Sequence, residues 1–338
     1  MKITITTPGL TTPHGGTRVL NEWANHLSNY HDVTLFVQDG GTHCPWMPLK
    51  VRVSNRLAHV SLADLVIIGS PHSIHLQRKA KKCVIFMQML EHMFSNKKHF
   101  HEQCNAFYNS PNLLLSISQW NIDYLREQGR TGEIKYIENG INLNDFPIKR
   151  TEKENAVLIE GWESGNKSKD SEHIAPQVAE RLRNEGHRIL AYSQKPLETL
   201  KHVPHEYYKC PSLAQMNELY SRAKILIKAS KYDARSTSPM EAMTKGTPTA
   251  RAIIQGDDDL IDGINCRRVN YDVEELYAAA KYLLTNDAQR AIIADECINY
   301  ISELGWSKKI KEINEILINY VCDSTFKKSL SGVSISEA

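Results

Sequence analysis

The sequence has no long apolar run. No stretch of its 338 residues approaches the roughly 20 apolar side chains that a membrane-spanning helix requires. The opening segment from Met1 to Pro8 alternates apolar with polar side chains and meets a proline at once, so it lacks the apolar centre of a secretory signal. With 41% hydrophobic and 24% charged residues, the composition excludes a disordered or collagen-like chain and indicates a globular protein with room for two cores.

Cysteines at metal-binding or disulfide-framework spacing are also absent. The chain has 7 cysteines, an odd number, and none belongs to a Cys-x-x-Cys pair. The sequence therefore predicts neither a disulfide framework nor a zinc site. A reducing compartment fits this usage, and we expect a cytoplasmic protein.

A net charge of +2 hides an uneven distribution. Residues 1–150 carry about five more positive than negative side chains, whereas residues 151–338 carry about three more negative ones. Two basic clusters, residues 78–82 and 96–101, could meet an anionic partner such as nucleic acid or membrane lipid. The alternative for either cluster is an ordinary solvated surface.

Short β-branched runs alternate with helical patterns from end to end, which is typical of parallel sheets covered by helices. In the first half we expect strands around Ile3 and at residues 33–37, 65–68, 83–86, 113–117 and 134–137, with a helix over 19–27. A polar stretch at 149–155 is the predicted linker. The second series has strands at 156–159, 188–192, 225–227 and 249–253, and helices at 171–185, 213–223, 273–286, 287–303 and 307–321.

This pattern predicts an α/β protein of two Rossmann-like, doubly wound domains, residues 1–150 and 151–306, that face a central cleft. Ligands of such sheets bind at the carboxyl ends of the strands, so we expect the site in that cleft. The Ser-rich tail from Asp323 to Ala338 shows little periodicity and is predicted to be disordered.

Residues 230–248 are the most informative segment. A strand feeds a polar loop with Ser236, Thr237 and Ser238, and we expect Ser238 to cap a helix whose first residue is Pro239. Free N–H groups and the positive end of the helix dipole make such a helix start an anion site, suited to a diphosphate.

Two carboxylates, Asp233 and Glu241, bracket this loop with seven residues between them. Because carboxylates repel a bound phosphate, we interpret them as acceptors of hydrogen bonds from sugar hydroxyls. One would meet the transferred sugar and the other the nucleotide ribose. The bland alternative for Glu241 is a capping box, since Ser238-x-x-Glu241 has that spacing.

The whole segment, two acids separated by seven residues and followed by Ala242-Met243-x-x-Gly246-Thr247-Pro248, resembles the donor-binding signature of retaining GT-B glycosyltransferases of family 4. The resemblance implies the GT-B fold and a nucleotide-diphosphate sugar as donor. This chain departs from the family at Asp233, where glutamate is usual, and at residues 234–238, which replace a glycine-rich loop.

A second match lies between the first strand and the first helix, where Gly15 and Gly16 precede Arg18. Glycines let backbone N–H groups approach a ligand closely, although a plain tight turn is the commoner meaning of a glycine pair. The resemblance implies that this loop covers the donor diphosphate and that Arg18 faces the cleft.

Further landmarks follow in the family's order, at residues 88–94, 115–120 and 138–142, so that the resemblance spans roughly residues 1–320. It implies that His92 lies near the sugar, although a lone histidine in a loop is more often structural. It also implies that the last helix, 307–322, crosses back to the first domain. It also implies that Lys167 or Lys169 neutralises the leaving diphosphate, with Trp162 where the family has an arginine. A solvent-exposed position is the alternative for at least one of these lysines.

An Asp-x-Asp pattern occurs within Asp257-Asp258-Asp259, and carboxylate clusters do bind Mg²⁺ or Mn²⁺. Its place after the strand at 249–253 corresponds to a loop of the resembled family, so we expect no metal site there and no cofactor.

The sequence thus predicts a metal-independent glycosyltransferase that moves a sugar from a nucleotide-diphosphate sugar to an acceptor hydroxyl, with retention of anomeric configuration. The positive first half suits modified DNA, a phosphorylated lipid at a membrane surface or an anionic glycan as acceptor. Alternatives are another nucleotide-sugar enzyme, such as an epimerase or phosphorylase, and a non-catalytic nucleotide-sugar-binding module. The sequence leaves the oligomeric state open.

Overall fold

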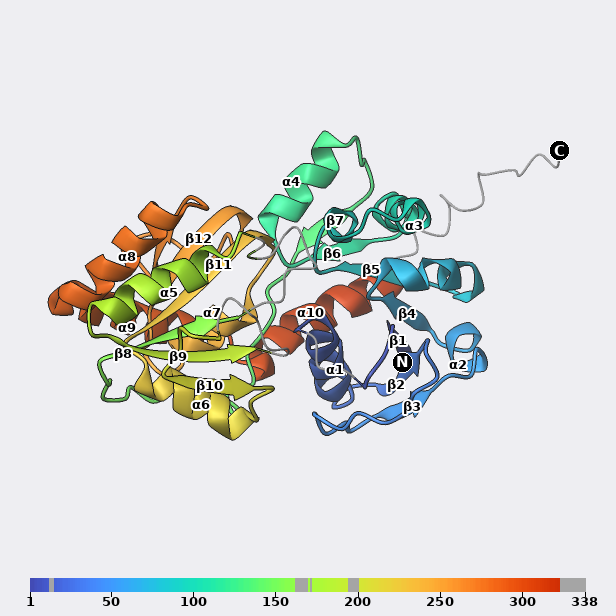
Figure 1. The fold of residues 1–338 in the computed structure, drawn as a ribbon. Coiled ribbons are helices and arrows are strands. Elements are labelled where there is room, and N and C mark those ends of the chain that lie inside the picture. The colour runs from blue at the N-terminus through green and yellow to red at the C-terminus, as the bar shows by residue number, and fades with distance from the viewer. Residues whose placement is uncertain (12–14, 162–169, 171, 194–200, 323–338) are drawn as a thin grey trace.

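The structure, a computed structural model, describes residues 1–11, 15–161, 170, 172–193 and 201–322. These residues form two α/β domains that lie side by side, each built on a parallel sheet with helices packed against it (Figure 1). The predicted fold class, two doubly wound parallel-sheet domains, is confirmed.

The first sheet has, within the described residues, seven strands in the order β3-β2-β1-β4-β5-β6-β7, and every pairing is parallel. Its strands are β1 Lys2–Thr7, β2 Asp32–Val37, β3 Arg52–Ser54, β4 Leu65–Ile68, β5 Cys83–Met87, β6 Leu114–Ser116 and β7 Ile134–Tyr136. Its helices are α1 Gly15–Leu27, α2 Ala58–Ser61, α3 Lys98–Tyr108 and α4 Gln119–Glu127, with 3₁₀ helices η1 Pro71–Lys79 and η2 Glu91–Phe94.

The second sheet runs β10-β9-β8-β11-β12-β13 in the described part of the chain, again entirely parallel. Its strands are β8 Ala156–Glu160, β9 Arg188–Ser193, β10 Glu206–Lys209, β11 Ile225–Asp233, β12 Thr249–Gly256 and β13 Cys266–Val269. The helices are α5 Ile174–Asn184, α6 Leu213–Arg222, α7 Thr237–Met243, α8 Val273–Thr285 and α9 Asp287–Ser302.

Each sheet reverses its winding direction once, between β1 and β4 in the first and between β8 and β11 in the second. At such a switch point the two loops leave in opposite directions and open a crevice at the carboxyl ends of the strands. The carboxyl ends of β1, β4, β8 and β11 are therefore the parts of the fold most suited to hold a ligand.

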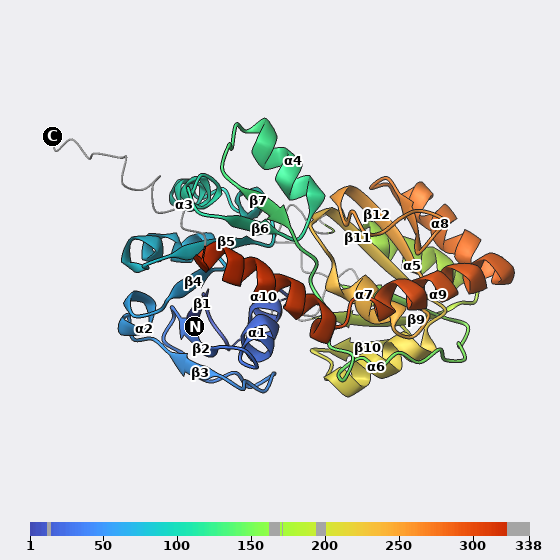
Figure 2. The ribbon, with the colours of Figure 1, turned by 180° about the vertical axis from the view of Figure 1, so that it is seen from behind.

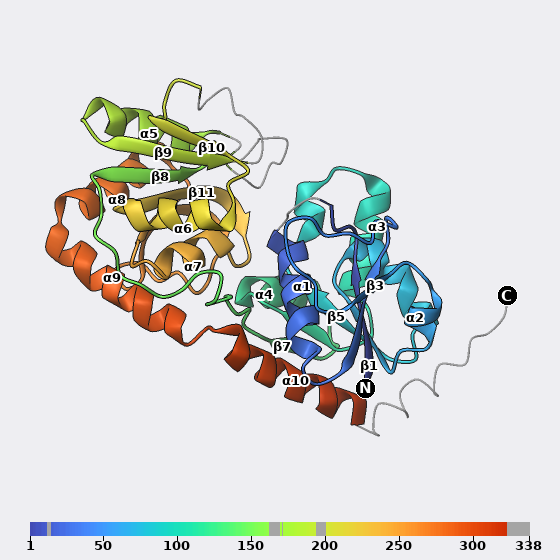
Figure 3. The same cartoon turned by 90° about the horizontal axis from the view of Figure 1, so that it is seen from below.

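The last helix, α10 Trp306–Cys322, leaves the second domain and packs on the first (Figures 2 and 3). Its buried face, which includes Ile310, Ile313 and Leu317, joins the apolar core of the first domain. At its start, Trp306 lies so close to Gly140 that an added Cβ would come within 2.6 Å of the indole. The segment after β7 also bonds to the residues just before α10, because Ile141 N–H donates to Leu304 O over 2.7 Å.

The start of α7 differs from the prediction. The helix begins at Thr237 and its N-cap is Ser236, so Ser238 is not the cap and Pro239 is not the first helical residue. The reason is Asp257, whose carboxylate accepts hydrogen bonds from the Ser236 N–H (2.6 Å) and Oγ (2.7 Å) and so fixes the turn two residues earlier. The capping-box interpretation of Glu241 is wrong, because its carboxylate lies elsewhere, as described below.

Gly256, the last residue of β12, allows the ends of β11 and β12 to touch. Its φ of +100° is a conformation that other residues rarely adopt, and an added Cβ would lie 1.5 Å from the carbonyl oxygen of Asp233. That carbonyl accepts the Asp257 N–H over 2.8 Å. Gly256 therefore fixes the backbone where β11 and β12 end.

We expect Gly256→Ala to destabilise the protein by about 3 kcal/mol or more, because a backbone overlap adds to the strained φ. The matched control is Gly186→Ala, at a φ of +91° with nothing within 4 Å of the added Cβ. There only the conformational cost of about 1–2 kcal/mol applies. Urea unfolding followed by circular dichroism measures both, and equal losses would contradict the proposed clash.

Candidate functional site

The amino ends of two helices from different domains lie close together. Gly15 begins α1 and Thr237 begins α7, and a Cβ added to Gly15 would lie 4.0 Å from Thr237 Oγ1. Gly16 is held by Gln88, whose side-chain N–H donates to its carbonyl over 3.1 Å. The positive ends of both helix dipoles thus point into one region, an arrangement that favours negative charge.

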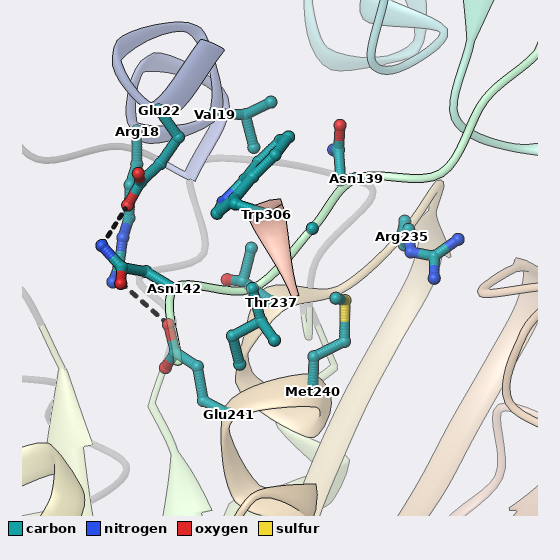
Figure 4. A pocket seen from close by; sticks show the side chains of 12 residues that line it. Arg18, Val19, Glu22, Asn139, Asn142, Arg235, Thr237, Met240, Glu241 and Trp306 are labelled. Atoms are coloured by element: carbon teal, nitrogen blue, oxygen red, sulfur yellow. Dashed lines mark hydrogen bonds and ion pairs between the residues drawn. The ribbon is translucent and has the colours of Figure 1, made fainter. Parts of the chain in front are cut away.

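An ion pair joins the domains beside these helix starts. Arg18 on α1 donates from Nη1 to Glu241 Oε1 on α7 over 2.9 Å, while its Nη2 lies 3.6 Å from Asp145 Oδ2. The other oxygen, Glu241 Oε2, accepts the Tyr220 hydroxyl over 2.9 Å. Burial raises the pKa of Glu241, against the opposing effects of the Arg18 cation and the Tyr220 hydroxyl. Figure 4 shows Arg18 and Glu241 reaching toward each other from the two domains.

This ion pair closes one side of a small cavity of about 40 Å³. A volume of this size has space for a few water molecules and not for a nucleotide sugar. Its lining comes from α1, residues 139–142, Arg235, α7 and the start of α10, as Figure 4 shows. A ligand that occupies the region must therefore displace Arg18 from Glu241 or bind beside the pair.

A second polar cluster lies at the carboxyl ends of β8 and β11. Lys228 Nζ contacts Glu160 Oε2 at 2.5 Å and lies 3.9 Å from Asp233 Oδ2. Ser238, in the first turn of α7, donates from Oγ to the same Glu160 oxygen over 2.6 Å. The predicted residues Asp233 and Ser238 therefore belong to one cluster, whose centre is a lysine that the sequence analysis did not single out.

The Asp-x-Asp segment is occupied by protein groups. Asp257 binds Arg251 Nε at 2.7 Å as well as Ser236, and Asp258 accepts the Ser118 hydroxyl at 2.5 Å. Asp259 accepts the Tyr300 hydroxyl at 3.2 Å. Within the described residues, no three His, Cys, Asp or Glu side chains are grouped so that they could hold a metal ion.

Arg235, from the loop that replaces the family's glycines, also connects the domains. Its guanidinium donates to Tyr136 Oη (3.2 Å) in the first domain and to Tyr300 Oη (2.8 Å) in the second, and it lies 3.6 Å from Glu138 and from Asp259. Next to it is a larger cavity of about 490 Å³, lined by residues of both domains: Gln119, Tyr136, Glu138, Asp258, Asp259, Ile261, Ile264, Asn265, Glu296 and Tyr300.

His92 lies apart from these clusters and lines neither cavity. Its two ring nitrogens lie 3.2 Å from Tyr108 Oη and 3.1 Å from Tyr124 Oη, and its ring stacks on Tyr124. Burial, and then the neighbouring His101, lower its pKa. The structure thus gives His92 a place in an aromatic cluster of the first domain, and its catalytic role stays a prediction.

The predicted residues fall into distinct groups. Gly15, Arg18, Thr237 and Glu241 come together at the helix starts, Gly16 lies next to Gly15, and Asp233 and Ser238 share the lysine-centred cluster; Ser236 is bound to Asp257. Lys167 and Lys169 lie outside the described residues, as do Trp162 and the tail from Asp323.

Sequence reasoning missed Glu160, Lys228 and Arg251. One signal was available for the two cations, because Lys228 follows three apolar residues and Arg251 lies between two alanines, and charged side chains are seldom fully buried without a partner. Their pairing in register across β11 and β12 was not readable from either strand alone.

None of the helices in the described ranges combines the length and apolar character that crossing a bilayer requires. No protein-family model matches the chain, and no curated protein sequence matches it.

Several solved structures are similar to this one over nearly the whole chain. HepE from Anabaena, in complex with UDP-glucose, has a TM-score of 0.73 at 15% identity and covers 94% of this chain and 100% of its own. Sucrose-phosphate synthase from Thermosynechococcus elongatus has a TM-score of 0.74 at 13% identity, with coverages of 94% and 98%. WaaG, a glycosyltransferase involved in lipopolysaccharide biosynthesis, has a TM-score of 0.66 at 15% identity, with coverages of 93% and 99%. The likeness confirms the predicted GT-B fold.

The His92 cluster yields a pH prediction through its neighbour Glu91, whose pKa burial raises to about 8 from 4.5. The folded state then holds this proton more tightly than the unfolded chain, so stability is lost as the pH rises from about 4.5 to 8. We expect the difference in the free energy of unfolding between Glu91→Gln and the wild type to shift by about 2–4 kcal/mol in favour of the variant between pH 4 and pH 9.

Urea unfolding at several pH values measures this difference. Glu127→Gln, at an exposed position on α4, is the control and should follow the wild-type profile. A Glu91→Gln profile parallel to that of the wild type would show that Glu91 is ionised in the folded protein.

Proposed function

We propose that this protein is a glycosyltransferase that transfers a sugar from a nucleotide-diphosphate sugar to an acceptor hydroxyl. The observation that carries the proposal is the meeting of the amino ends of α1 and α7 at Gly15 and Thr237, beside the Arg18–Glu241 pair. The helix ends suit a diphosphate, and the Arg18–Glu241 pair suits a ribose. The GT-B fold supports the proposal, since similar structures include one with UDP-glucose bound.

In this proposal the diphosphate binds at the start of α1, beside Gly15 and Gly16. Glu241 accepts hydrogen bonds from the ribose hydroxyls. Arg18, which holds Glu241 in the present structure, then moves toward the phosphates, and the carboxylate changes partner without losing all of its hydrogen bonds. Lys167 or Lys169 neutralises the charge that grows on the leaving diphosphate, which stabilises the transition state more than the ground state.

Asp233 would accept hydrogen bonds from the hydroxyls of the transferred sugar. We propose retention of anomeric configuration and no catalytic metal, following the resembled family, in which the leaving phosphate helps to deprotonate the acceptor. The partners of Asp257, Asp258 and Asp259 support the second point, because these carboxylates already neutralise or accept from protein groups.

We further propose an anionic acceptor, presented by the more basic first domain: modified DNA, a phosphorylated lipid or an anionic glycan. Binding to DNA would weaken steeply with salt, whereas a lipid acceptor would bring the protein to vesicles as a peripheral protein.

A second candidate is a non-catalytic module that binds nucleotide sugars. Two observations favour it: the cavity at the helix starts measures only about 40 Å³, and Asp257 occupies the Ser236 N–H group at the start of α7. Such a module would bind a nucleotide sugar and release no product, either by transfer or by hydrolysis.

The test is a panel of UDP-, GDP-, ADP- and dTDP-sugars, measured first by thermal shift and then by release of nucleoside diphosphate. We expect one donor to raise the midpoint of thermal unfolding and to be consumed. Glu241→Ala, and Glu241→Gln as the variant closer in size, should weaken its binding about 10- to 100-fold, because hydrogen bonds to a charged group are lost.

Lys167→Ala should lower product release with little change in binding, since its partner is the leaving group. Glu274→Ala, at an exposed carboxylate on α8, is the control and should behave as the wild type. Full activity of both Glu241 variants and of Lys167→Ala would remove the proposed donor site.

A further inference from the structure

We infer that Lys228 and Arg251 are positioning residues for Asp233: two buried cations hold its carboxylate where it receives the hydroxyls of the donor sugar. The inference rests on the proposed function, and it concerns residues that the resemblance to family 4 did not single out. Neither cation needs to touch the substrate, because each acts through Asp233.

The two cations approach the same oxygen from neighbouring strands. Lys228 Nζ and Arg251 Nη2 each lie 3.9 Å from Asp233 Oδ2, a distance for charge attraction and too long for a hydrogen bond. They pair in register, Lys228 on β11 opposite Arg251 on β12. The side chains of Lys228 and Asp233 are each 9% exposed and that of Arg251 is 0% exposed, so water screens these attractions little.

Each cation has a second carboxylate that fixes its position. Lys228 contacts Glu160 at the end of β8 (2.5 Å), and Arg251 Nε binds Asp257 after β12 (2.7 Å). Burial lowers the pKa of Lys228, but the Glu160 and Asp233 carboxylates outweigh burial and hold that pKa above the ordinary lysine value. The result is a row of alternating charges along the carboxyl edge of the sheet, with Asp233 between the two cations.

The backbone of Asp233 is fixed as firmly as its side chain. Its carbonyl accepts the Asp257 N–H over 2.8 Å, and Gly256 packs against that carbonyl with no space for a Cβ. Arg251 therefore acts on Asp233 twice, directly by charge and indirectly by holding Asp257 in the turn.

Stability does not explain this row of charges. A buried ion pair often costs as much in desolvation as it returns, and well-packed apolar side chains in its place are commonly neutral or stabilising. Arg251 Nη2 also has no hydrogen-bond partner within the part of the chain that the structure describes. A costly and incompletely satisfied network of charges near the carboxyl ends of strands is expected where a carboxylate must be held ready for a ligand.

A carboxylate that lies between two cations can accept charge-assisted hydrogen bonds, which are stronger than neutral ones. The transferred sugar offers hydroxyl donors to such a group, whereas the nucleotide does not reach it in the proposed arrangement. Loss of the Lys228 charge should therefore weaken recognition of the sugar and leave recognition of the nucleoside diphosphate unchanged.

The experiment compares the affinities of Lys228→Met for UDP-glucose and for UDP, or for the pair that the donor panel selects, by titration calorimetry. We expect the nucleotide sugar to bind about tenfold more weakly, as for a lost hydrogen bond to a charged group, and the nucleoside diphosphate to bind as in the wild type. Lys228→Arg, which keeps the charge, should recover most of the loss.

Lys245→Met is the matched control, since Lys245 is also buried but its Nζ donates to the Pro147 carbonyl at the domain connection. It should bind both ligands as the wild type does. If Lys228→Met does not fold, Lys228→Gln, which is polar but uncharged, takes its place, with the same selective loss expected.

A double variant distinguishes positioning from a structural effect. If Lys228 acts through Asp233, then Lys228→Met should cost no further affinity in an Asp233→Asn background, and the two losses should not add. Equal losses for both ligands, no loss for either, or additive losses would overturn the inference while leaving the proposed function intact. A wild-type protein that binds no nucleotide sugar of the panel would overturn the proposed function, and the inference with it.

Discussion

The burial of the Arg251 guanidinium is the constraint on which the architecture of the site depends. A cation removed from water must meet an anion, and Arg251 meets Asp257 at 2.7 Å with both side chains fully buried. To supply that carboxylate, β12 must end in a tight turn, which Gly256 permits. The same carboxylate then caps Ser236 and sets where α7 begins. One buried ion pair thus determines the position of a helix that contributes Glu241 to the cleft.

The two domains are joined by polar contacts as well as by α10. The Arg18–Glu241 pair lies on one side of the connection and Arg235, between Tyr136 and Tyr300, lies on the other. Polar contacts of this kind exchange partners more readily than an apolar interface does, because each group can bind water or a ligand instead. In the proposed function, a nucleotide that binds Glu241 would displace Arg18 and so change one of the contacts between the domains.

The sequence allowed the fold to be predicted well, because long apolar strands and amphipathic helices carry strong periodicity. The missed strands, β3, β10 and β13, are three or four residues long, too short for a period to show, and they lie toward the edges of their sheets. The start of α7 was predicted two residues late, because proline and serine signals marked Ser238 whereas a carboxylate 21 positions away determines the cap.

The candidate site was predictable only in part. Motif spacing marked Asp233 and Glu241 as candidate site residues, and their roles stay predictions; the pairing of Glu241 with Arg18 of the other domain was not predicted. The cations beside Asp233 could not be placed, because their meeting depends on which strands are neighbours and in which register they pair. Spacing along the chain carries local information, whereas a cluster built from β8, β11 and β12 is a property of sheet order.

The loop at residues 234–238 departs from the glycine-rich loop of the resembled family, and the structure gives a physical reason for the difference. Glycines would shape such a loop through backbone freedom alone. Here side chains shape it: Arg235 connects the domains, Ser236 is bound by Asp257, and Ser238 by Glu160. A loop held by its side chains loses less freedom on binding but accommodates fewer ligand shapes. Under the proposed function, the choice of donor should therefore depend on this loop and on the charges beneath it more than on contacts to the nucleotide.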